Sequence, residues 1–81
     1  MALSRERLAT ITEILRQELG EPELQVSFAT NLREIARWDS LHHLRIVVAL
    51  EDRFAVRFGD DELLELTSVA SIATALERHL P

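Results

Sequence analysis

The chain has 81 residues, enough for one small hydrophobic core, so we expect a single domain over residues 1–81. Hydrophobic residues make up 47% of it and aromatic residues 5%, which is typical of leucine-rich helices. The lack of Cys excludes disulfides, and the net charge of −5 disfavours nucleic acid as a partner. No apolar run reaches the roughly 18 residues of a membrane span, and charged residues begin too early for a secretory signal, so we expect a cytoplasmic protein without a membrane partner.

The first segment, from Ser4 to Leu19, has the pattern of an amphipathic helix. Its apolar residues recur at intervals of three and four, with charged residues between them: Leu8, Ile11, Leu15 and Leu19. Ser4 can cap the start of this helix, and Gly20 followed by Pro22 supplies a stop signal. We expect the helix to have a purely structural role.

Residues 20–38 show no sustained periodicity and are predicted to form a long connection. A connection of this length is uncommon in a small domain and is usually functional. We expect residues 32–36 to form a short helical turn, and apolar residues to hold the connection against the core: Leu24, Val26, Phe28, Leu32 and Ile35. Trp38 is predicted to pack the end of the connection against the helices, with contact to a bound group or a partner as the alternative.

A second helix is predicted to begin at Asp39-Ser40-Leu41. Asp39 is a preferred N-cap residue, because its carboxylate accepts hydrogen bonds from the first free backbone N–H groups of a helix. Ser40 then falls in the first turn, where those N–H groups and the helix dipole favour negative charge. A phosphate ester on Ser40 would therefore lie in a favourable electrostatic position.

The helix predicted from Ser40 to Phe54 has apolar residues on more than one face. One stripe has the spacing of a core face: Ile46, Val47, Leu50 and Phe54. A second stripe, which we call the docking stripe, mixes apolar and charged residues: Leu41, Leu44, Arg45, Val48, Glu51 and Asp52. Three apolar residues would be unnecessary on a face that meets only water, so we expect a partner to bind there. The alternative is that a small bundle buries this helix on most sides.

After Phe54 we expect a loop with buried anchors up to Gly59, followed by a short helix and a last helix. Three acids at residues 60–62 complement the dipole at the start of the short helix. We expect three leucines to pack it inward: Leu63, Leu64 and Leu66. Ser68 can cap the last helix, whose apolar residues recur at helical intervals: Val69, Ile72, Ala73, Leu76 and Leu80. The predicted fold class is all-α, with three longer helices, one short helix and a long first loop.

The central segment resembles the modification site and second helix of acyl carrier proteins, on these residues: Asp39-Ser40-Leu41, Leu44, the run from Ile46 to Leu50, Glu51-Asp52 and Phe54. The serine lies near the middle of a chain of about the family's length, so the resemblance covers nearly all of it. It implies an acyl carrier protein-like four-helix bundle, in which a long first loop leads to the serine. Many family members have acids just after the Ser-Leu pair, whereas this chain has His42, His43 and Arg45, which indicates partners with a less basic or more apolar docking site.

The resemblance implies a carrier protein and not an enzyme. Its cofactor would be a phosphopantetheine arm, attached to Ser40 between Asp39 and Leu41 by a separate phosphopantetheinyl transferase. The thiol of the arm would hold acyl or aminoacyl intermediates as thioesters for the loading and transferring enzymes of fatty acid, polyketide or related specialised biosynthesis. We expect the carrier to be a monomer. The alternative is an unmodified acyl carrier-like module that binds a protein through the docking stripe.

Catalytic and metal-binding roles for the residues around Ser40 are disfavoured by geometry. An acid and two histidines are its near neighbours, but residues one to three apart at a helix start cannot form a Ser-His-Asp chain, because each partner must approach from a different direction. Trp38 and His42 also stand where the exposed turn of a hydrolase serine has glycine. Adjacent residues His42 and His43 project about 100° apart on a helix and Cys is absent, so no metal site is predicted. We expect both histidines on a solvated or docking surface.

Overall fold

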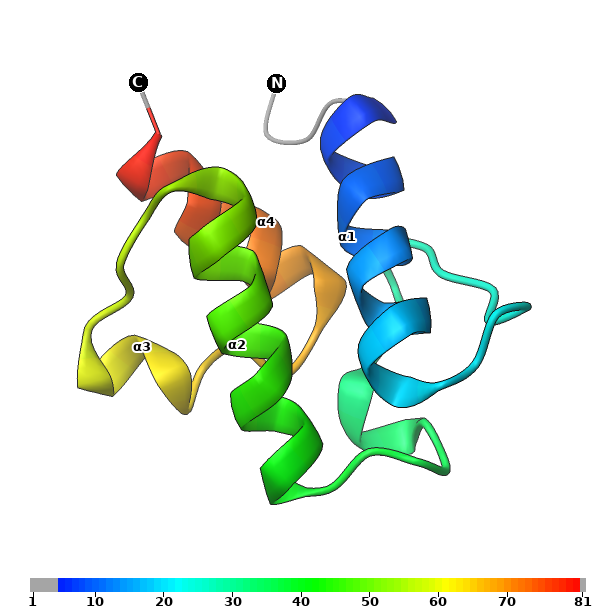
Figure 1. The fold of residues 1–81 in the computed structure, drawn as a ribbon. Coiled ribbons are helices and arrows are strands. Elements are labelled where there is room, and N and C mark those ends of the chain that lie inside the picture. Colours follow the sequence, from blue (N-terminus) through cyan, green and yellow to red (C-terminus); the bar gives the residue numbers. More distant parts are fainter. Residues whose placement is uncertain (1–4, 81) are drawn as a thin grey trace.

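The computed structural model describes residues 5–80, which form four α-helices and one short 3₁₀-helix (Figure 1). The elements in chain order are α1 Arg5–Leu19, η1 Leu32–Glu34, α2 Ser40–Phe54, α3 Asp60–Leu63 and α4 Val69–His79. The predicted all-α bundle of three longer helices and one short helix is thereby confirmed. Of the helices in the described range, none is both long and apolar enough to cross a membrane.

The hydrophobic core lies between α1, α2 and α4. Its largest fully buried side chains are Ile11, Leu15, Leu19, Leu32, Ile46, Leu50, Leu66, Val69, Ile72 and Leu76. The loop between α2 and α3 adds Val56 and Phe58, which are the buried anchors predicted for it. The core stripe predicted for α2 is confirmed, with Phe54 only partly buried at its end. Burial of these side chains supplies the main stabilisation of the bundle.

The helix ends follow from residues that satisfy free backbone groups. Ser68 caps α4 by accepting a hydrogen bond from Ser71 N–H at 3.1 Å, as predicted. Gly20 follows α1 with a φ of 66°, the left-handed conformation in which glycine is least strained. Ala55 ends α2 in the same conformation, with a φ of 55°. The cap predicted at Ser4 lies outside the described residues.

The connection from residue 20 to residue 38 is attached to the segment that precedes α4. Leu32 N–H donates to Thr67 O at 2.8 Å, and Val69 N–H donates to Thr30 O at 3.0 Å. Leu32 itself is fully buried, and three other predicted anchors pack partly buried against the core: Leu24, Val26 and Ile35. The predicted helical turn is present as η1, although it ends at Glu34. The connection therefore carries the chain to α2 along a defined path.

Two residues expected to face the core are exposed. Phe28 is about half exposed, because a turn closed by the hydrogen bond from Thr30 N–H to Ser27 O places it at the tip. Leu64 is 80% exposed. The reason is that α3 has a single turn, which directs Leu63 towards the core and leaves Leu64 at its outer end. Neither side chain stabilises the bundle in the way the pattern predicts.

Candidate functional site

Ser40 is the first residue of α2 and is exposed. The residue before it, Asp39, is the N-cap and has extended backbone angles. Its carboxylate accepts a hydrogen bond from His42 N–H at 2.8 Å, and the His42 ring lies 2.7 Å from the same oxygen. The predicted helix start and the predicted cap are both confirmed. Ser40 thus stands in the first turn of a capped helix, where the dipole favours negative charge.

The electrostatics of this turn keep Asp39 ionised. The hydrogen bond from His42 N–H, and then the bond from the His42 side chain, lower the pKa of Asp39 below its ordinary value. This carboxylate is occupied as a cap, while the His43 ring is bonded to residues other than Ser40, so no Ser-His-Asp chain is assembled. Within the described part of the chain, no three His, Cys, Asp or Glu side chains are grouped as metal ligands.

A cavity of about 240 Å³ opens directly beside Ser40, and we call it the Ser40 cavity. It lies between the end of the long connection, the first turn of α2 and the segment from α3 to α4, and its lining residues are Arg33, Trp38, Ser40, His43, Leu63, Leu64 and Thr67. All of them are exposed or partly buried, so the cavity is a surface feature that does not enter the core. The exposed Leu64 is one of these lining residues.

His43 joins three parts of the Ser40 cavity, a role that the sequence pattern did not indicate. Its Nε2 donates to Leu63 O at 2.9 Å, because a carbonyl can only accept. Its Nδ1 is therefore the acceptor for Trp38 Nε1–H, at 3.4 Å. The two rings also pack edge to face, with centroids 5.6 Å apart. The ring of His43 is thus fixed in one tautomer between Trp38 and α3, and Trp38 packs the loop end on the bundle as predicted.

The apolar residues of the docking stripe are exposed on α2. The exposed fractions are 58% for Leu41, 54% for Leu44 and 49% for Val48. The alternative, in which a small bundle buries α2 on most sides, does not hold for these residues. A groove of about 430 Å³ runs along the stripe and reaches α1, lined by Glu18, Leu44, Arg45, Val48, Ala49 and Asp52. This face offers apolar contact area between side chains of both charges.

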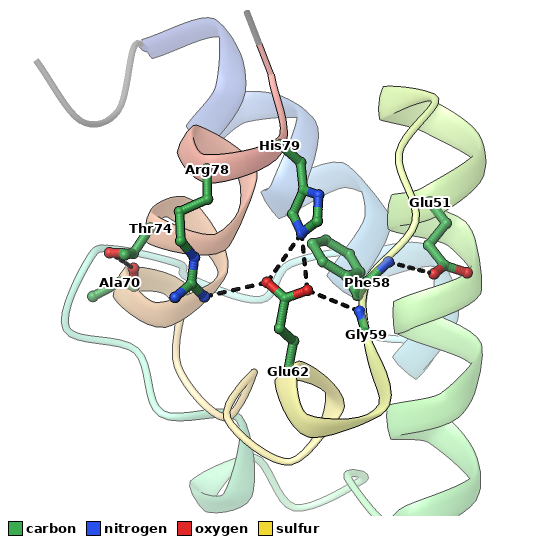
Figure 2. Close-up of polar contacts among 8 residues, drawn as sticks. All are labelled: Glu51, Phe58, Gly59, Glu62, Ala70, Thr74, Arg78 and His79. Atoms are coloured by element: carbon green, nitrogen blue, oxygen red, sulfur yellow. Dashed lines mark hydrogen bonds and ion pairs between the residues drawn. The ribbon is translucent and has the colours of Figure 1, made fainter.

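Glu51 differs from the other residues of the docking stripe. It is partly buried, and its carboxylate accepts a hydrogen bond from Phe58 N–H at 2.9 Å (Figure 2). That bond holds the loop between α2 and α3 against α2. The carboxylate of Glu51 therefore has a structural role, unlike the exposed side chains of the docking stripe.

Glu62 connects α3 to the end of α4 (Figure 2). Its carboxylate accepts from Gly59 N–H at 2.8 Å, lies 2.9 Å from His79 Nε2 and 3.3 Å from Arg78 Nη2. The bond from Gly59 N–H and then the contact with His79 lower the pKa of Glu62. These contacts hold the helix whose last residue, Leu63, lines the Ser40 cavity.

Comparison with known proteins covers most of the bundle. A family model described as "Phosphopantetheine attachment site" matches residues 9–76. Among solved structures, the chain is similar to the holo acyl carrier protein of Geobacter metallireducens, determined by solution NMR. The two are 30% identical, the match covers 88% of this chain and 82% of that chain, and the TM-score is 0.78. Sequence and fold thus point to the same group of proteins.

Proposed function

Because the chain belongs to the acyl carrier protein family, we propose that Ser40 is the attachment residue for phosphopantetheine. Members of this family are carriers with a covalently attached phosphopantetheine, and they are not enzymes. The observation that carries the proposal is the position of Ser40, exposed in the first turn of a helix capped by Asp39. A serine there is accessible to a modifying enzyme, and a phosphodiester on it would meet the positive end of the helix dipole.

The residues around Ser40 fit the chemistry of the group. Its phosphate would be held near the first free N–H groups of α2, and the positively charged residue Arg33 lines the same cavity. The hydrocarbon and amide parts of the group suit a cavity that combines apolar Trp38, Leu63 and Leu64 with polar Thr67. When attached, the group supplies a terminal thiol that holds an acyl or aminoacyl cargo as a thioester.

Attachment requires a phosphopantetheinyl transferase that takes the group from coenzyme A. A bond forms between Ser40 Oγ and the phosphorus next to the pantetheine, the bond from that phosphorus to the nucleotide half breaks, and the nucleotide leaves. The proton of the serine hydroxyl is lost in the same step. Asp39 is occupied by His42, so we assign the acceptance of this proton to the transferase. The contribution of the chain is to expose the hydroxyl and to stabilise the product electrostatically.

We further propose that the docking stripe binds the transferase and the enzymes that load and unload the carrier. Leu41, Leu44 and Val48 supply exposed apolar area that starts next to Ser40, and Arg45 and Asp52 border it. Because this border carries both charges, partners with a mainly apolar docking site fit best. The carrier would act as a monomer on intermediates of fatty acid, polyketide or related specialised biosynthesis.

The test is the intact mass of the purified protein before and after incubation with coenzyme A and a broad-specificity phosphopantetheinyl transferase. The wild type should gain the mass of one phosphopantetheine, and Ser40→Ala should gain none. Ser27→Ala, which removes another exposed serine, should be modified like the wild type. A folded wild type that gains no mass would instead support the unmodified protein-binding module.

A further inference from the structure

A hydrogen bond from His43 links α2 to α3 at the Ser40 cavity. His43 extends from α2, donates to the carbonyl of Leu63 at the end of α3 and accepts from Trp38 Nε1–H. The donor and the acceptor of the ring are both used, so the ring cannot turn away without breaking two hydrogen bonds. His43 is partly buried, as is Leu63, so water cannot fully replace these partners.

The Ser40 cavity also ends at His43 and its two hydrogen-bond partners. Its lining includes Trp38, His43 and Leu63, and it contains no residue of the buried core. The core residues of α2, Ile46 and Val47, have almost no exposed surface. Any apolar chain that moved from Ser40 into the bundle between α2 and α3 would therefore have to displace His43 first.

A second set of contacts resists the same movement. Glu62 holds α3 to the end of α4 through His79 and Arg78 (Figure 2). Moving α3 away from α2 would strain these contacts as well as the bond from His43 to Leu63. Adjacent residues of α3 are thus tied to different helices, Glu62 to α4 and Leu63 to α2, which leaves the single turn little freedom to swing outward.

We propose that His43 is a specificity-determining residue that closes the bundle between α2 and α3 to the cargo. The acyl group then stays outside the core, at the Ser40 cavity or in solvent, whatever its length. This rests on the proposed attachment of the group at Ser40. A carrier with its cargo outside presents it to partners without first opening the bundle, and cannot select cargo by the size of an internal cavity.

The experiment loads Ser40 with acetyl- or decanoyl-phosphopantetheine from the matching coenzyme A thioesters and measures the rate of thioester cleavage by hydroxylamine. Rates are divided by those of the same thioesters of free pantetheine. The wild type should give equal ratios for the two cargoes. His43→Ala should cleave its decanoyl cargo more slowly, and if half of the molecules hold the cargo inside, the rate should fall about twofold. The melting temperature of His43→Ala should rise with the decanoyl cargo and not with the acetyl cargo.

Two variants separate closure from a general effect of the substitution. His43→Gln keeps an N–H donor for Leu63 O and should behave like the wild type. His42→Ala removes the neighbouring ring, which contacts Asp39 and not α3, and should also behave like the wild type. Decanoyl protection in the wild type, or its absence in a folded His43→Ala, would overturn the proposal.

Loading is checked by intact mass, so a failure of the proposed function is seen separately. If Ser40 stays unmodified, the same comparison is made on the unmodified chains with free decanoate as the probe. Decanoate should then raise the melting temperature of His43→Ala and leave that of the wild type unchanged. Equal stabilisation of the two proteins would contradict closure by His43 without any use of the carrier function.

Discussion

Replacing Leu32 by alanine tests how firmly the long connection is fixed to the bundle. Leu32 has no exposed surface, and truncating a fully buried leucine costs about 2–5 kcal/mol from lost transfer energy and the cavity left behind. A domain of this size has a total stability of about 4–12 kcal/mol, so a loss of about 3 kcal/mol is a large share of it. Phe28 lies in the same connection but is about half exposed, and Phe28→Ala should cost less than about 1 kcal/mol.

The assay is urea unfolding at equilibrium, followed by far-UV circular dichroism and by the fluorescence of Trp38, the only tryptophan. With a slope of about 1–1.5 kcal/mol per molar urea, Leu32→Ala should lower the midpoint by about 2–3 M, and the slope itself should not change. Phe28→Ala serves as the matched control. Similar midpoints for the two variants would refute the assignment of Leu32 as the buried anchor.

Three further predictions concern the cap, the contacts of α3 and the docking stripe. Asp39→Ala should lower the melting temperature measured by circular dichroism at pH 7, because the cap is lost. Asp39→Asn should lower it much less, since its amide oxygen can still cap, and equal decreases would argue against capping. The pKa of Glu62 is lowered in the folded state, so its contribution to stability is present above the ordinary value of 4.5 and is lost as pH falls through the lower folded-state pKa. The melting temperature of Glu62→Gln should therefore fall less than that of the wild type when pH is lowered from about 6 to 3, and parallel curves would contradict this. Leu44→Asp and Val48→Asp should slow cargo transfer by a cognate enzyme with little change in melting temperature, because both side chains are exposed, and unchanged transfer would exclude the stripe as a docking site.

The sequence was sufficient to predict α2 and its two faces, because the rules involved are local. The cap at Asp39 lies directly before the helix, and the buried and exposed residues follow its period. The stop at Gly20 and the cap at Ser68 are equally local, which is why the last residue of α1 and the first residue of α4 agree with prediction. The position of Ser40 in the first turn follows directly from the cap.

The surroundings of Ser40 could not be predicted in the same way, since they depend on contacts between distant segments. The partner of His43 on α3 is 20 residues away, and nothing in the pattern near His43 indicates it. Phe28 and Leu32 are both apolar residues in a segment without periodicity, so only the path of the chain decides which is buried. Leu64 follows a helix of one turn, which is too short for a period to establish its inner face.

The two backbone hydrogen bonds between the long connection and the start of α4 hold the two ends of residues 31–68 together, and we call this segment the lobe. Asn31 and Ser68 pair as an isolated antiparallel bridge, so the segment with α2, α3 and Ser40 begins and ends at the same place. Bringing together the ends of such a segment costs about 3 kcal/mol of chain entropy, which packing must offset before the lobe can close. Because the tie uses backbone groups, side-chain changes at its ends leave it in place. Val69→Pro would instead delete the N–H that binds Thr30 O, one of the two bonds of the tie, and should lower the melting temperature even though the first position of a helix ordinarily tolerates proline.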